Sequence, residues 1–356
     1  MFHFFYFSFL LLRIVGRGVV VRRQEHKWAT GKLVRIEQRF NCRLNPLTFN
    51  KIVASYALFI PLVSDGYTGL QGRNTNRQER ERLFHYFICS SLFDDFCDRL
   101  DCPEERLTKM SFQPHLAKPN NGDEAIFLYA HILLRNIFEG ERLKHYDYLS
   151  RQIYRSQKHS EQQFDPSVTD EALEVITREK GGYSLLITNL YLDIPLTDEV
   201  QDCCFHMGFL IQLINDIFDI YKDLHDEAEG SATLPNRIRD VANFDQYFSS
   251  LAKAFQTKIL GIHVSHKRKK RFFLHMTALC ALGHTGINQL RLVERQYGKL
   301  PLLKELPRNA VVIDMAKWRN FYYWLKRTYM ETKYMSGAMS CKQVTRSAKN
   351  NFSLNN

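Results

Sequence analysis

Two segments of this 356-residue chain carry apolar residues on almost every face of a helix, and each is interrupted by one narrow stripe of acids. The first segment runs from about Asn76 to Asp98. In it, Asp98 follows Asp94 and Asp95 by four and three positions, so the three carboxylates project from the same side of a helix. Carboxylates this close repel one another and are costly to desolvate unless a multivalent cation binds them.

The second segment, from about Glu199 to Leu224, repeats this arrangement about 120 residues later. Its polar stripe consists of Gln212, Asn215, Asp216, Asp219 and Asp223. Asn215, Asp219 and Asp223 are spaced i, i+4, i+8, which stacks three oxygen ligands along about two helical turns. Oxygen-only ligation favours Mg²⁺ or Mn²⁺. Either stripe alone could be a solvated helix face, but two stripes that face each other in a bundle would form one metal-binding cavity.

The rest of the sequence also predicts helices. Apolar residues recur every three or four positions, strand-like alternation is scarce, and the chain has only 17 Gly and 10 Pro. We therefore expect an all-α protein with a single domain at residues 45–335, folded as a helix bundle around a central cavity.

Two local signals refine this prediction. Ser167 followed by Asp170 resembles a capping box that opens a helix. The pair Gly181-Gly182 interrupts the same helical pattern, and each Gly costs about 1 kcal/mol relative to Ala in a helix interior. We expect this pair to break the helix into two halves.

The two ends of the chain differ from the middle. The first 12 residues, MFHFFYFSFLLL, are apolar and are followed by Arg13, Arg17, Arg22 and Arg23. This run is too short to span a bilayer. It could be a weak membrane anchor, a degenerate signal or residues upstream of the true start codon, and we favour the last interpretation. We expect residues 1–44 as a whole to form an apolar and basic segment of uncertain order. Residues 336–356, rich in Ser, Lys and Asn, are expected to be a flexible tail.

Charge and cysteine usage restrict the partners and the compartment. The formal net charge is +11, which suits a polyanionic partner such as a diphosphate or an anionic lipid. The densest basic run, His266 to Arg271, lacks stacking aromatics and any nucleic-acid motif, so we expect a solvated helix start or a lipid-headgroup patch and no nucleic acid. The eight scattered Cys show no CxxC spacing, which is typical of a reducing compartment. We expect a cytoplasmic protein, with peripheral membrane contact as an alternative.

The acidic stripes carry a resemblance to a known superfamily. Asp94-Asp95-Phe96-Cys97-Asp98 resembles the DDxxD motif of class I terpenoid synthases, and the segment from Asn215 to Asp223 resembles their second motif, NDxxSxx(K/R)(E/D). The one departure is Asp219, where that family has Ser or Thr. Gln212 to Asp219 also approaches the QxxDDxxD of chain-elongating prenyl synthases, and Asp219 with Asp223 matches the second DxxxD of squalene and phytoene synthases. The resemblance covers roughly residues 45–330.

The resemblance implies a site for three Mg²⁺ ions, with Mn²⁺ as a substitute, that grips the diphosphate of an allylic isoprenoid. The implied metal ligands are Asp94, Asp95, Asp98, Asn215, Asp216, Asp219 and Asp223. Lys222 would contact the diphosphate, and Arg178 would sense it from upstream of the expected helix break. The remaining substrate-binding candidates are Phe87, Lys180, Gly182, Tyr183, Phe209 and Gln212; the aromatic rings among them could face a carbocation.

The activity we expect is that of a terpene cyclase, which ionises an allylic diphosphate and releases diphosphate. A prenyl-coupling enzyme, of the prenyl diphosphate synthase or the squalene and phytoene synthase type, is the alternative. A non-catalytic helical protein that binds isoprenoid lipid or anionic membrane is the second alternative. All three allow a homodimer, and the sequence leaves the chain length of the substrate and the product skeleton open.

Overall fold

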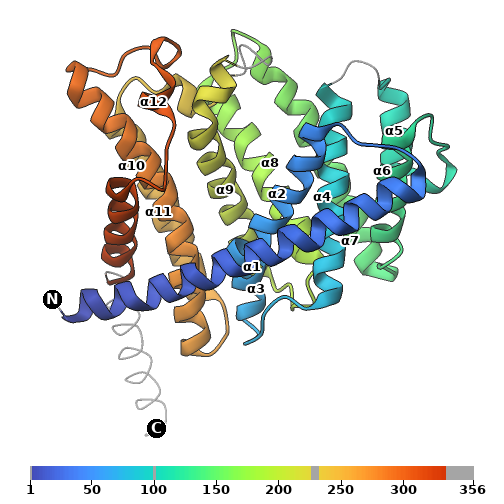
Figure 1. Cartoon of the computed structure of the whole chain (residues 1–356), viewed down its shortest axis with the longest axis horizontal. Coiled ribbons are helices and arrows are strands. Elements are labelled where there is room, and N and C mark those ends of the chain that lie inside the picture. The colour runs from blue at the N-terminus through green and yellow to red at the C-terminus, as the bar shows by residue number, and fades with distance from the viewer. Residues whose placement is uncertain (1, 99–101, 226–231, 334–356) are drawn as a thin grey trace, which may run out of the picture. The chain divides into compact units, whose positions relative to one another are not determined.

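The computed structural model describes residues 2–98, 102–225 and 232–333, and every regular element in these ranges is a helix (Figure 1). The all-α prediction is confirmed for this part of the chain, while the expected tail at 336–356 lies outside it. The α-helices are α1 (Phe2–Phe40), α2 (Pro46–Phe59), α3 (Asp65–Gly69), α4 (Arg77–Asp98), α5 (Glu104–Phe112), α6 (Gly122–Arg135), α7 (Gly140–Ser160), α8 (Asp170–Leu190), α9 (Asp198–His225), α10 (Val241–Gly261), α11 (His266–Tyr297) and α12 (Arg308–Val311). Residues 318–333 are also helical.

The helices fall into two compact units. The N-terminal unit is Arg13–Phe209, and the C-terminal unit consists of Met1–Leu12 and Leu210–Asn356. The boundary at residue 209 lies inside α9, so the two acidic segments of the sequence belong to different units: α4 to the first and the acidic half of α9 to the second.

Two residues at the first turn of α2, Asn45 and Pro46, explain where this helix begins. The Asn45 side chain accepts a hydrogen bond from the Leu47 backbone N–H, and Pro46 occupies the first turn, where no intrahelical donor is lost. The helical path continues past α2 through a π-helical turn, Ile60–Ser64, into α3. Pro61 lies in that turn, as expected for a residue that cannot donate to the preceding turn. Within this unit α2 packs against α4, the helix with the first acidic stripe.

The segment before residue 45, for which the sequence predicts uncertain order, forms α1. In the N-terminal unit its Ala29, Leu33 and Ile36 are buried. Glu25 is also buried, and its carboxylate accepts hydrogen bonds from Tyr56 Oη at 2.7 Å and from Arg80 Nη1 at 2.5 Å. The arginine on α4 therefore balances a charge on α1.

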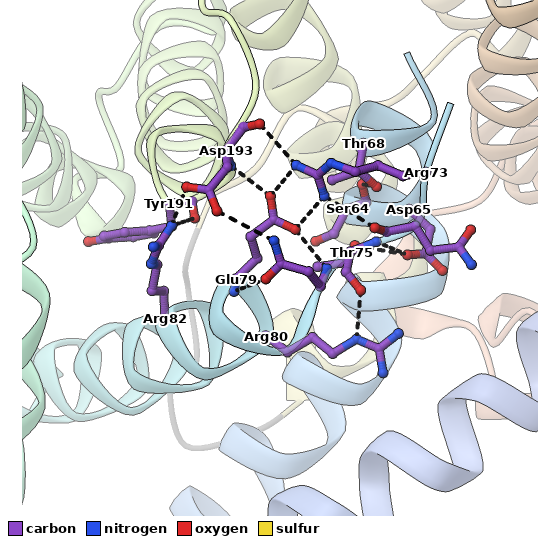
Figure 2. Close-up of polar contacts among 12 residues, drawn as sticks. Ser64, Asp65, Thr68, Arg73, Thr75, Glu79, Arg80, Arg82, Tyr191 and Asp193 are labelled. Carbon is purple, nitrogen blue, oxygen red and sulfur yellow. Dashed lines mark hydrogen bonds and ion pairs between the residues drawn. The ribbon is translucent and has the colours of Figure 1, made fainter. Parts of the chain in front are cut away.

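A buried carboxylate, Glu79, fixes the start of α4 (Figure 2). Arg73 donates to both of its oxygens at 2.6 and 2.7 Å, and the backbone N–H groups of Asn76 and Asp193 donate at 2.7 and 2.6 Å. Burial raises the pKa of Glu79, but these donors outweigh it and lower that pKa below its ordinary value. Asp193 in turn accepts from Arg82 at 2.6 Å, so the segment after α8 is tied to the first turns of α4.

Helix α8 corrects two expectations. Its N-cap is Thr169, whose Oγ1 accepts from the Ala172 N–H, whereas Ser167 forms a turn with Asp165. The helix runs without a break through Gly181 and Gly182.

The predicted break at Gly181-Gly182 is wrong because these glycines admit a neighbouring helix. A Cβ on Gly208 of α9 would lie 2.2 Å from the Gly181 carbonyl oxygen, and a Cβ on Gly182 would lie 2.5 Å from the ring of Phe205. Helices approach this closely only where side chains are absent. The cost of glycine in α8 is therefore offset by backbone contact with α9.

In the C-terminal unit, α10 packs against α11, and a charged network joins both to the 318–333 helix. The ring of His284 is buried, with Nδ1 3.1 Å from Asp245 Oδ1 and Nε2 3.2 Å from Glu331 Oε1. Arg291 pairs with Asp245 at 2.6 Å, and Arg327 pairs with Glu331 at 2.7 Å. Each carboxylate of this network thus has two basic partners.

Candidate functional site

The acids of α4 lie next to polar residues of α2 in the N-terminal unit. Lys51 Nζ donates to Asp94 Oδ2 at 3.0 Å, and Thr48 Oγ1 donates to Asp95 Oδ2. The Lys51–Asp94 pair is accessible, with 43% and 29% of the two side chains exposed. An ammonium group therefore partly balances the first acidic stripe. Asp98 ends α4, and its side chain lies outside the described part of the chain.

The acids of α9 form an accessible stripe in the C-terminal unit. Asn215 and Asp219 are exposed and Asp223 is half-buried, so the three oxygen-bearing side chains predicted at i, i+4, i+8 all reach solvent. Asp216 differs from them because it is buried and its Oδ1 accepts from Gln212 Nε2 at 2.8 Å. Asp216 and Gln212 were predicted as metal ligand and substrate contact, respectively; here they contact each other. Lys222, predicted to bind diphosphate, is exposed.

Close packing holds α9 with its acids outward. A Cβ on Gly286 of α11 would lie 2.3 Å from Ile217 Cγ2, and a Cβ on Gly283 would lie 3.0 Å from Ile214 Cγ1. The apolar side of α9 therefore rests directly on the backbone of α11. This contact fixes the rotation of the helix about its own axis, so Asn215 and Asp219 point away from α11.

The predicted residues of α8 lie in the N-terminal unit beside Phe205 and Glu174. Arg178 is half-buried, and its Nη1 lies 4.0 Å from Oε1 of Glu174, one turn earlier. Lys180 is also half-buried. Tyr183 packs edge-on against Phe205 with ring centroids 5.3 Å apart, and burial raises the pKa of its phenol. Gly182 contacts the same phenylalanine, so its observed role is to admit an aromatic ring.

Phe87 and Phe209, two of the aromatic residues predicted to bind substrate, are packed at least partly inside the protein. Phe87 is half-buried, with Phe59 and Tyr86 each at a ring-centroid distance of 5.3 Å. Phe209 is buried, with 3% of its surface exposed. Both rings contribute to the hydrophobic packing of the N-terminal unit.

Within residues 2–98, 102–225 and 232–333, no group of three or more His, Cys, Asp or Glu side chains lies close enough together to hold a metal ion. The predicted ligands on α9 are instead spread along one helix face, and one of the three is an amide. Such an arrangement suits a Mg²⁺ ion that takes its remaining ligands from water and phosphate oxygens.

Sequence reasoning missed Thr48 and Lys51, which contact the acids of α4. They lie three positions apart on α2, and Lys51 is the one charged residue in the sequence of that helix. This lone charge in an apolar helix was the available signal. Its partner Asp94 is 43 residues away, so the pairing itself could not be predicted.

Two helical stretches, Pro46–Gly69 and Asp198–His225, are long and apolar enough to cross a membrane by length and composition. In their most apolar windows, 50% and 61% of the residues are buried inside the protein. Core helices of soluble proteins pass the same test, so these stretches are only a weak indication of membrane association.

The seven cysteines that the structure describes are all free thiols.

Comparison of the chain with protein-family models and with curated proteins finds no match.

Proposed function

We propose that this protein is a Mg²⁺-dependent class I isoprenoid synthase that releases diphosphate from an allylic isoprenoid substrate, most simply as a terpene cyclase. The observation that carries the proposal is the accessible stripe of Asn215, Asp219 and Asp223 on α9. Three oxygen ligands at consecutive turns can bind Mg²⁺ together with phosphate oxygens. Close packing on α11 holds that stripe in one orientation before any ligand binds.

The acids of α4 supply the second part of the proposal. Asp94 and Asp95 are held by Lys51 and Thr48 in positions that remain partly accessible. We infer that Asp94 and Asp95 bind Mg²⁺ on the substrate diphosphate, as the resemblance to the first superfamily motif implies. The bound metal would stabilise the charge that develops on the departing diphosphate.

The chain's own residues would do the remaining work. The cation of Lys222 can bind a diphosphate oxygen and is exposed on the same helix as the metal ligands. Arg178 would contribute a second cation; its ion pair with Glu174, at 4.0 Å, is at the outer limit of such a contact. Phe87, Tyr183 and Phe209 would shield a carbocation from water.

The test is incubation of the purified chain with C10 to C25 allylic diphosphates and Mg²⁺, followed by mass spectrometry of the products. A cyclase gives hydrocarbon or alcohol products without a second substrate. Products that form only when isopentenyl diphosphate is added identify the prenyl-coupling alternative. Asp202→Asn is a matched control because this exposed acid lies on α9 outside the stripe. Absence of diphosphate release from every substrate, with the chain folded, would exclude the proposal.

A second candidate function is binding to an anionic membrane surface through the run from His266 to Arg271. This run opens α11, and five of its six residues are exposed. Cations at a helix N-terminus are disfavoured by the helix dipole, so a favourable interaction with the α11 dipole does not explain this run. Co-sedimentation with vesicles containing phosphatidylserine tests this function, and equal binding to neutral vesicles would contradict it.

A further inference from the structure

A cavity of about 620 Å³ lies between α4 and the end of α6 in the N-terminal unit. One wall is formed by the first turns of α4, with Arg77, Glu81 and His85 among its residues. The other wall is apolar and includes Leu133 and Ile137, which are 39% and 38% exposed. The cavity therefore opens to solvent, and its volume is typical of a small-molecule site.

His85 gives this cavity a specific chemical requirement. The residue is 7% exposed, and its Nε2 is buried without a hydrogen-bond partner in the part of the chain that the structure describes. Burial lowers the pKa of His85 to about 4, opposed in part by a hydrogen bond to the backbone of Glu81, so the ring is neutral at pH 7. That bond to a helix carbonyl uses the single N–H of the ring and leaves Nε2 as an acceptor.

A buried acceptor without a donor is costly, and native proteins rarely leave one unpaired. The side chains that share the cavity do not supply the donor. Arg82 is bonded to Asp193 and to the Tyr191 carbonyl, and Glu81 pairs with Lys32 at 3.3 Å. The described side chains that line this cavity therefore leave Nε2 without a donor.

Arg77 indicates a second property of a ligand for this cavity, an anionic group. It lines the same cavity, is exposed, and has no ion-pair partner among the described residues. The other two charged residues of the wall, Glu81 and Arg82, already have partners. Arg77 precedes His85 by eight positions, which places their Cα atoms about 12 Å apart along α4. A guanidinium at this place suits a carboxylate or a phosphate.

We infer that this cavity binds a small amphiphile with an anionic group at one end and a hydroxyl group at the other. The anion would pair with Arg77, the aliphatic body would cover Leu133 and Ile137, and the hydroxyl would donate to His85 Nε2. The site uses none of the residues assigned above to metal or diphosphate binding, so its test is independent of isoprenoid synthase activity.

Isothermal titration calorimetry of the full chain with 10-hydroxydecanoate, decanoate and 1,10-decanediol tests the inference. We expect one saturable site for 10-hydroxydecanoate and at least about tenfold weaker binding of each of the other two probes, because each lacks one of the polar groups. A parallel titration with 10-hydroxydecyl phosphate shows whether a phosphate or a carboxylate is preferred as the anion.

Two variants assign the polar contacts. Arg77→Met should weaken binding of 10-hydroxydecanoate at least about tenfold, whereas the matched control Arg22→Met, an exposed arginine outside the cavity, should leave it unchanged. His85→Phe should weaken binding of 10-hydroxydecanoate but not of decanoate. Equal losses for Arg77→Met and Arg22→Met, or no saturable heat at millimolar ligand, would overturn the inference. If His85→Phe does not fold, the affinities of the parent chain for 10-hydroxydecanoate and decanoate are compared instead. Equal affinities would mean that water bonds to Nε2, and they would reject the proposed hydroxyl contact.

Discussion

Lys51 Nζ lies 3.0 Å from Asp94 Oδ2, so the first acidic stripe is already paired with a cation supplied by α2. The pair is accessible, and exposed ion pairs contribute only about 0–1 kcal/mol. A divalent cation can therefore displace the ammonium at small cost. Lys51 thus moderates the repulsion between adjacent carboxylates, and in the proposed function it would compete with Mg²⁺ for Asp94.

The first prediction tests this competition. Lys51→Met should strengthen Mn²⁺ binding by about two- to fivefold, because up to about 1 kcal/mol of pairing no longer opposes the metal. Electron paramagnetic resonance of free Mn²⁺ measures this affinity without any substrate. Lys144→Met, which removes another exposed lysine with a carboxylate partner, is the control and should have no effect. Weaker Mn²⁺ binding in Lys51→Met than in the control would contradict the prediction.

The second prediction concerns stability in acid. Burial raises the pKa of Asp245, but bonds from His284 and Arg291 outweigh it and lower this pKa to about 2; the pKa of Glu331 is lowered in the same way by His284 and Arg327. In the unfolded chain the pKa of each group is near 4. The unfolded state thus binds more protons between about pH 4 and pH 2, and stability falls as pH falls through this window.

Asp245→Asn isolates the contribution of one carboxylate. The free energy of unfolding of this variant should be about 2 kcal/mol lower than that of the parent at pH 7. It should also depend less on pH between pH 4 and pH 2. Urea unfolding followed by circular dichroism at a series of pH values measures both effects. Asp147→Asn, which removes a more exposed ion pair with Arg135, is the control. An acid dependence of Asp245→Asn that matches the parent would show that the network does not govern acid unfolding.

The sequence predicts the helices well where the apolar pattern is long. The predicted limits of α4 and α9 lie within one residue of the observed ones at each end, because these helices are apolar on most faces and have clear polar flanks. The prediction failed at Gly181-Gly182, because helix propensity is a local property whereas these glycines are explained by Phe205 and Gly208 on another helix.

The candidate site shows the same division between local and distant information. The i, i+4, i+8 stripe on α9 follows from helix geometry alone, and the structure places all three residues at accessible positions. The contact between Lys51 and Asp94 and the unpaired nitrogen of His85 depend on packing between helices far apart in the sequence. Neither could be predicted from residue spacing.

The third prediction tests the close approach of α8 and α9. Gly208→Ala should destabilise the protein by about 1–3 kcal/mol, because the added methyl group would lie 2.2 Å from the Gly181 carbonyl oxygen and the helices must move apart. Gly16→Ala is the matched control, since it also lies within a helix but has no atom within 4 Å of the new methyl group. The free energy of unfolding of Gly16→Ala should rise by about 0.5–1 kcal/mol, because Ala favours a helix interior more than Gly does. Urea unfolding of the two variants should therefore give changes of opposite sign, and equal changes would contradict the packing account of Gly208.

The last prediction separates metal ligation by the α9 stripe from mere solvation of a helix face. Asp223→Ala removes a charged ligand from the proposed Mg²⁺ site, so diphosphate release should fall by about a hundredfold or more while the fold is retained. Asp219→Ser should keep substantial activity, because the superfamily motif has a hydroxyl at this position and Ser can still offer an oxygen to the metal. If the stripe only solvates α9, both substitutions should change stability by less than about 0.5 kcal/mol and leave turnover unaltered. Diphosphate release and melting temperature are measured in parallel for both variants and for Asp202→Asn, which removes an exposed acid of the same helix outside the stripe. An Asp223→Ala enzyme as fast as the Asp202→Asn control would refute the metal site.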